Sequence, residues 1–144
     1  METSKILFDV ETSDADCLIG IKIILDDVTL LDIAHVKEKI TFSHAMSDDD
    51  GEHELKIELS GKTIDHTKID EHGNIIKDAV LQVSNVTIDA IDVHKLFLEK
   101  CVYTHDFNGT QPEIADTFYG TAGCNGTISF RFTTPIYLWI LENM

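Results

Sequence analysis

The sequence predicts an all-β fold: an antiparallel two-sheet β-sandwich of jelly-roll type, with residues 1–144 as a single domain. Two segments, 37–45 and 52–60, alternate apolar and polar residues with the period of two that is typical of strands with one buried face. About nine or ten such runs recur at spacings of roughly 8–12 residues, as in sandwiches and jelly rolls. No segment shows the period of a helix of ordinary length.

In the first half of the chain, β-branched runs and turn residues mark the strands. The apolar run 17–25 stops at Asp26 and Asp27, and the pattern resumes at 28–33, which predicts a tight hairpin. The strands expected in this half are 5–10, 17–25, 28–33, 37–45 and 52–60.

The segments 37–45 and 52–60 are expected to pair as an antiparallel hairpin across an acid-rich turn. Their alternation places one set of side chains on the buried face: Ile40, Phe42 and His44 in the first, and His53, Leu55, Ile57 and Leu59 in the second. We expect a core that includes Phe42, Leu55, Ile57, Phe130 and Phe132.

The second half continues the pattern around glycine-containing turns. The expected strands are 63–70, 74–77, 79–88, 91–98, 100–107 and 126–133. Residues 108–125 contain two Asn-Gly pairs, Pro112 and Gly120, and are predicted to be a long loop with a short strand near 118–119. The apolar tail after Pro135 is predicted to be a short C-terminal helix, with a terminal strand as the alternative.

Charge and composition exclude several classes of partner. Eleven Lys and Arg stand against 26 Asp and Glu, a formal charge of −15, which repels nucleic acid and anionic membranes. The acidity suits a basic protein surface, a divalent cation or a neutral sugar. We find neither a signal peptide nor a membrane span and expect synthesis in a cytosol with free, buried cysteines at Cys17, Cys101 and Cys124.

No constellation of reactive residues predicts an enzyme, since no nucleophile elbow or glycine-rich phosphate loop is present. The strongest metal alternative is a cation shared by His44 and His53 on the inward face of the expected hairpin, but a third ligand at a recognisable spacing is missing. We therefore expect these two side chains to form a hydrogen-bonded pair at the rim of the sandwich.

The acidic turn after residue 47 suggests calcium as an alternative, because hard oxygen ligands on a turn are what that ion requires. The candidate ligands are Asp48, Asp50 and Glu52. Contiguous acids on a hairpin tip more often form a solvated turn that protects a sheet edge. We therefore expect no cofactor, with calcium kept as the alternative.

Aromatic residues gather beside the long loop, where we expect a ligand-binding surface over 103–120. Three rings would supply stacking surface for a sugar: Tyr103, Phe107 and Tyr119. Four polar side chains would orient the sugar through hydrogen bonds: His105, Asp106, Asn108 and Asp116. The alternative is that the rings seal the end of the core.

The strand order over residues 17–95 resembles calcium-dependent, jelly-roll carbohydrate-binding modules. Gly51, His53, Leu55 and Ile57 match that family's Gly-x-His-x-Leu-x-Ile strand, and a second strand is matched by Leu81, Val83, Ile88 and Ile91. The resemblance implies a sandwich that binds carbohydrate, with calcium.

The whole chain, and especially residues 101–109 and 118–144, resembles small proteins encoded by tailed phages of marine cyanobacteria. This resemblance implies a virion location after synthesis in the host cytoplasm, and docking on a larger virion protein. Our first expectation is a non-enzymatic binding or structural module of a phage particle that recognises host-surface polysaccharide. The second is a calcium-dependent carbohydrate-binding module, and a metal-dependent enzyme is a distant third.

Overall fold

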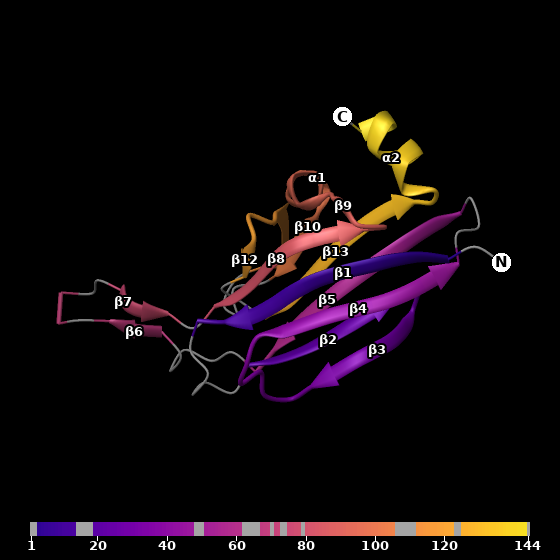
Figure 1. Ribbon diagram of the computed structural model, residues 1–144. Helices are drawn as coiled ribbons and strands as arrows, with labels where there is room; N and C mark the ends of the chain where they lie inside the picture. The colour runs from indigo at the N-terminus through magenta and orange to yellow at the C-terminus, as the bar shows by residue number, and fades with distance from the viewer. Residues whose placement is uncertain are drawn as a thin grey trace.

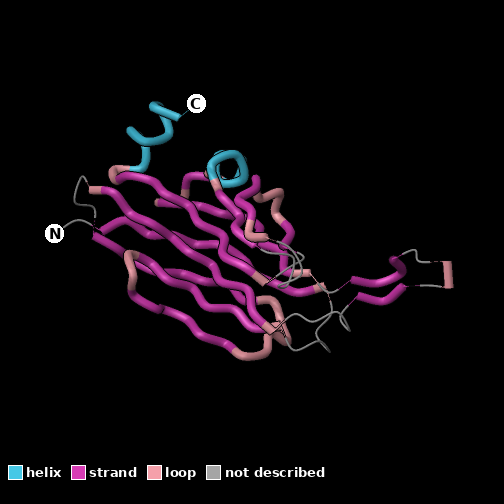
Figure 2. The backbone as a smooth tube through the Cα atoms, turned by 180° about the vertical axis from the view of Figure 1, so that it is seen from behind, coloured by secondary structure: helices cyan, strands magenta, loops and turns pink. Residues whose placement is uncertain are grey.

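A computed structural model describes residues 3–13, 19–47, 51–61, 67–69, 71–72, 75–78, 80–105, 112–122 and 125–143. Two antiparallel sheets face each other as layers of a sandwich (Figures 1 and 2), which confirms the predicted fold class. The first sheet, sheet A, has the order β12-β8-β1-β4, with β9 paired to β8. The second, sheet B, has the order β11-β10-β13-β5-β2-β3.

The bounds of the elements follow in two lists. Sheet A contains β1 (Thr3–Thr12), β4 (Ile40–Ser47), β8 (Leu81–Ile88), β9 (Ile91–Asp92) and β12 (Thr121–Ala122). Sheet B contains β2 (Gly20–Leu25), β3 (Val28–Ile33), β5 (Glu52–Ser60), β10 (Val102–His105), β11 (Ile114–Thr117) and β13 (Gly126–Thr133).

Three further features lie outside the two sheets. The hairpin of β6 (Thr67–Ile69) and β7 (Ile75–Asp78) stands apart from both layers in Figure 1. The helix α1 spans His94–Lys100, and α2 spans Ile136–Asn143 after Pro135. The predicted C-terminal helix is therefore confirmed. Among the described residues, neither helix is long and apolar enough to cross a membrane.

The core fills the space between the two layers. All five residues that the alternation predicts as buried are buried: Phe42, Leu55, Ile57, Phe130 and Phe132. In β5 every second residue from His53 to Leu59 points inward, and Glu54, Lys56 and Glu58 point outward. Cys101 is a buried free thiol, as predicted, and burial raises its pKa. Cys17 and Cys124 lie outside the described residues.

The predicted pairing of 37–45 with 52–60 is wrong. The strand β4 pairs with β1 in sheet A, whereas β5 pairs with β2 and β13 in sheet B. The chain therefore crosses from one layer to the other between the two strands. Alternation reports only which face of a strand is buried, and a crossover satisfies that pattern as well as a hairpin does.

The predicted strand over 91–98 is wrong beyond Asp92, because α1 begins at His94. Phe97 from α1 is fully buried, and its ring lies 6.1 Å from Phe118 and 5.0 Å from Phe130 between centroids. The run after Val93 contains Leu, Lys and Glu, which are good helix formers, and the resulting helix of about two turns buries Phe97. The short strand expected near 118–119 is replaced by β11, which ends at Thr117.

Candidate functional site

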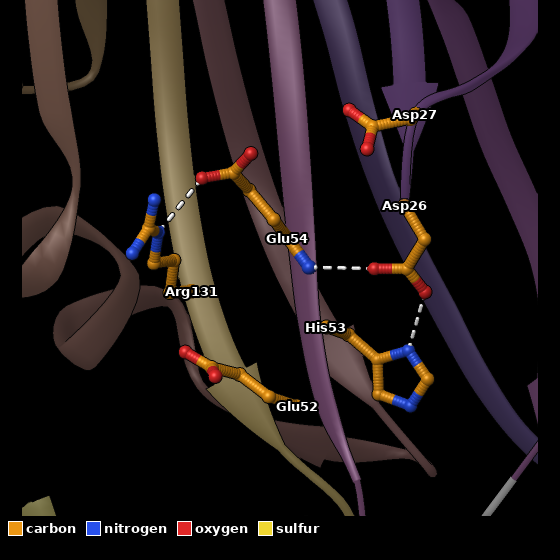
Figure 3. Close-up of a pocket in the computed structure, with 6 residues that line it drawn as sticks. All are labelled: Asp26, Asp27, Glu52, His53, Glu54 and Arg131. Carbon is orange, nitrogen blue, oxygen red and sulfur yellow. Dashed lines mark hydrogen bonds and ion pairs between the residues drawn. The ribbon is translucent and has the colours of Figure 1, made fainter.

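An open cavity of about 410 Å³ lies at one end of sheet B (Figure 3). It forms where the turn between β2 and β3 meets the start of β5 and the end of β13. We call it the Asp26–Arg131 cavity, and its lining residues are Asp26, Asp27, Glu52, His53, Glu54 and Arg131.

Asp26 fixes the turn against β5 through three hydrogen bonds. Its backbone N–H donates to the Glu54 carbonyl at 3.0 Å, and its Oδ1 accepts the Glu54 N–H at 2.8 Å. Its Oδ2 lies 2.6 Å from Nδ1 of His53. Asp26 and Asp27 have φ of 50° and 66°, the left-handed conformation that a two-residue hairpin turn requires. The turn is therefore held in one position relative to the strands.

His53 anchors the cavity from the core side. The residue is 5 % exposed, and its ring stacks on Phe132 with centroids 5.6 Å apart. Its Nε2 lies 3.4 Å from Oγ1 of the buried Thr134, just before α2. The imidazole thus connects the β2–β3 turn to the end of β13.

Glu54 and Arg131 face each other directly across the β5–β13 pair. Nε of Arg131 donates to Oε2 of Glu54 at 2.7 Å, and Nζ of Lys56 lies 3.3 Å from Oε1. These contacts, first of all the Arg131 hydrogen bond, lower the pKa of Glu54 below its usual value. The same hydrogen bond raises the pKa of Arg131, so the guanidinium is held in place and charged.

Three groups of the cavity keep free hydrogen-bonding capacity. Asp27 and Glu52 are exposed, and within the described part of the chain their carboxylates make no hydrogen bond. Across the described residues Arg131 bonds only through Nε, which leaves both Nη groups of its guanidinium for a ligand. The cavity therefore offers both acceptors and donors to one ligand.

The predicted surface over 103–120 is only partly described. Tyr103 is buried at 7 % exposure and packs on His105 with centroids 4.4 Å apart, so its ring is not available for stacking. Asp116 is exposed on β11, where its Oδ1 accepts the Thr117 N–H at 2.8 Å. Tyr119 is 79 % exposed. The other predicted residues, Asp106, Phe107 and Asn108, lie outside the described residues.

Sequence reasoning missed Asp26, Asp27, Glu54 and Arg131 as members of one site. The pair of acids at 26 and 27 is the one local signal, and from the sequence it predicts a hairpin turn without indicating a site. The proximity of Glu54 and Arg131 depends on the β5–β13 register, which alternation does not determine.

His44 and His53 do not lie opposite each other in a hairpin, because their strands belong to different sheets. Both line a groove of about 410 Å³ between the edge strands β3 and β4, together with Leu30 and Met46. His44 pairs with Ile6 of β1 and His53 with Phe132 of β13. Within the described ranges these residues belong to no group of three metal-binding side chains.

The described residues do not fit a calcium ion. Calcium needs several oxygen ligands around one point. In the described part of the chain, no three His, Cys, Asp or Glu side chains converge closely enough to hold a metal. Of the predicted ligands, Glu52 is exposed at the start of β5, and Asp48 and Asp50 lie outside the described residues.

Comparison with known proteins finds likeness in fold. No protein-family model matches the sequence, and no curated protein sequence matches it. Among solved structures, the chain is similar to the selenomethionine form of vCBM60, described with two families of calcium-dependent carbohydrate binding modules linked by circular permutation. The TM-score is 0.54 at 12% identity, over 88% of this chain and 89% of that chain. A second structure, vCBM60 in complex with galactobiose, has a TM-score of 0.49 at 13% identity, over 88% and 96%.

Proposed function

We propose that this chain is a non-enzymatic module that binds carbohydrate, and that the Asp26–Arg131 cavity holds the sugar. One observation carries the proposal: the carboxylates of Asp27 and Glu52 and the Nη groups of Arg131 line one open cavity, and within the described residues none of these groups makes a hydrogen bond. The fold likeness to vCBM60, whose description names carbohydrate binding modules, supports the same class of ligand.

The chemistry of the cavity suits sugar hydroxyls. Each hydroxyl both donates and accepts a hydrogen bond, so the carboxylates and the guanidinium that line one cavity can engage different hydroxyls of one sugar. The Glu54 contact fixes the guanidinium before the sugar arrives, and the Asp26 bonds fix the turn that carries Asp27. Prearranged groups lose little conformational freedom on binding, which favours affinity.

The test compares conservative variants of the cavity with a variant of the surface over 103–120. Asp27→Asn and Glu52→Gln keep shape and backbone preference but remove the negative charge, and we expect each to weaken oligosaccharide binding at least tenfold, about 1.4 kcal/mol. Calorimetric titration with a panel of plant and cyanobacterial oligosaccharides measures affinity, and the melting temperature checks folding. Tyr119→Ala is the matched control, because Tyr119 is exposed outside the cavity.

The outcomes separate the alternatives. Unchanged binding in both cavity variants, with binding lost in Tyr119→Ala, would move the site to the surface over 103–120. Binding that disappears in EDTA and returns with calcium would support the alternative of a calcium-dependent carbohydrate-binding module. A wild-type chain that binds no oligosaccharide would contradict the proposal.

We further propose that the module works in a phage particle, where it docks on a larger virion protein and contacts host-surface polysaccharide after synthesis in the host cytoplasm. The resemblance over 101–109 and 118–144 supports this location, and the exposed apolar residues of α2 support a docking role. Co-sedimentation of the purified chain with tailed phage particles of marine cyanobacteria tests it. A chain that stays in the supernatant with every particle tested would contradict the virion role.

A further inference from the structure

The helix α2 carries large apolar side chains on all sides. Ile136 and Trp139 point into the core, where the ring of Trp139 meets Phe130 edge-on at 5.5 Å between centroids. The opposite side exposes Tyr137 at 57%, Leu138 at 46% and Leu141 at 70%. We call these three residues the α2 outer face, and their spacing of i, i+1 and i+4 places them on one side of the helix.

A helix that is apolar all round is normally buried all round. Scattered exposed apolar residues are ordinary on a protein surface, but three large ones on one short helix form a contiguous patch, which is typical of an interaction site. The spacing of i and i+4 anchors matches the way helices insert into apolar grooves of partner proteins.

The charges around α2 specify the partner further. Glu142 is exposed on the helix itself. Just before the helix, the Thr134 N–H donates to the Gly51 carbonyl at 3.1 Å, which holds the start of α2 against the chain that leads into β5. Arg131, two residues before Thr133, is already paired with Glu54. The patch is thus apolar, with an exposed carboxylate at its border near the end of α2, on a chain with a formal charge of −15.

We infer that the α2 outer face docks on a partner protein whose surface has an apolar groove bordered by Lys and Arg. A second copy of this chain is disfavoured, because each copy carries a formal charge of −15 and presents the same acidic border. The inference rests on the proposed docking role and adds the surface and the chemistry of the partner.

Trp139 is the chain's single tryptophan and lies in α2, so its fluorescence reports directly on events at this helix. The probe is a synthetic peptide of two antiparallel helices with a leucine-lined groove between them and lysines along its border, and the same peptide with glutamates in place of the lysines is the control. We expect the lysine peptide to shift the Trp139 emission and to bind at least tenfold more tightly than the glutamate peptide. Binding should weaken about tenfold between about 50 mM and about 300 mM salt, because screening acts on the charged border.

Variants locate the surface. Leu138→Glu and Leu141→Glu should each reduce affinity for the lysine peptide at least tenfold. Val102→Glu is the matched control, since Val102 on β10 is 44% exposed, close to the 46% of Leu138. Circular dichroism confirms that each variant is folded, and Leu141→Ser repeats the test without added charge.

Three results would overturn the inference: no binding of the lysine peptide, equal binding by Leu141→Ser and wild type, or a dimer in sedimentation that Leu141→Glu abolishes. The last would assign the surface to a second copy. Failure of the docking role itself is seen separately, in co-sedimentation with phage particles. A chain that co-sediments equally well with and without Leu141→Glu docks through another surface.

Discussion

Glu54 links the charge chemistry of the candidate site to the stability of the fold. Its carboxylate accepts a hydrogen bond from Arg131 on β13 and lies within ion-pair distance of Lys56 on its own strand. Because these contacts favour the ionised form, the pKa of Glu54 is lower in the folded chain than the ordinary value of 4.5. The ion pair therefore stabilises the fold only while Glu54 is ionised.

The sign of the pH effect follows from linkage. A lowered folded pKa contributes stability above pH 4.5, and that contribution is lost as the pH falls from 4.5 through the folded pKa. We expect Glu54→Gln to be less stable than wild type near neutral pH and to lose less stability on acidification. Urea denaturation from about pH 7 to about pH 3 measures both. Asp9, whose pKa the Asn85 and Thr41 hydrogen bonds also lower, remains in both proteins as a common background. Parallel stability curves for wild type and Glu54→Gln would contradict the prediction.

Sheet A and sheet B each contain a two-residue turn whose first residue is an aspartate that is hydrogen-bonded to a neighbouring strand. Asp26 precedes β3 and Asp89 precedes β9, and both have positive φ. The backbone N–H of Asp89 donates a hydrogen bond to the Lys5 carbonyl, and its Oδ1 accepts one from the Lys5 N–H at 2.8 Å. Asp26 makes the same two hydrogen bonds with Glu54. Each carboxylate thus ties a two-residue turn to the neighbouring strand. The second turn residues differ, since Asp27 lines the cavity and Ala90 does not.

Glycine substitutions at the second residue of each turn test fold stability and sugar binding independently. The left-handed conformation costs a non-glycine residue roughly 1–2 kcal/mol, partly offset by the greater freedom of glycine in the unfolded chain. We expect Ala90→Gly, at φ 63°, to stabilise the fold by about 0.5–1 kcal/mol without changing sugar affinity. Asp27→Gly should change stability less, because aspartate tolerates this conformation better, but should weaken sugar binding. Calorimetric unfolding and sugar titration measure the two effects, and a loss of stability in Ala90→Gly would refute the argument.

The elements that the sequence predicts well are those whose signals are local. The hairpin of β2 and β3 follows from two acids between β-branched runs, and β13 follows from the alternation of Ile128, Phe130 and Phe132. The pairing of β4 with β1 depends on the packing of segments far apart in the chain, for which the sequence carries no local signal. For the same reason, the contact of Arg131 with Glu54 could not be predicted, although both residues were recognisable as outward positions of strands.

Across the whole molecule, β5 is the strand on which sheet B depends. Ile57 lies at its middle with no exposed surface, in register with Ile23 of β2 and Ile128 of β13. All three side chains contribute to the core between the sheets. A charge at this position has no partner and no access to water.

Ile57→Asp should therefore abolish cooperative folding. An unpaired carboxylate in the core destabilises by an amount on the order of the whole stability of a small domain, about 5–15 kcal/mol. Ile57→Val is the matched control and should cost about 0.5–1.5 kcal/mol. Near-ultraviolet circular dichroism and thermal unfolding distinguish the two. A melting temperature for Ile57→Asp within a few degrees of wild type would contradict the burial of this strand.

Both sheets are completed late in synthesis, and β1 illustrates this in sheet A. This strand leaves the ribosome before any of its neighbours, yet it lies between β4 and β8 in sheet A. One edge of β1 stays unpaired until residues 81–88 emerge from the ribosome. In sheet B, one edge of β5 stays unpaired until β13, which ends at Thr133, has been synthesised. Both layers are thus closed by distant partners, a topology that folds over milliseconds to seconds. During translation of the final third, the edge of β5 therefore stays open to other nascent chains, and a chain truncated before β13 is prone to aggregation.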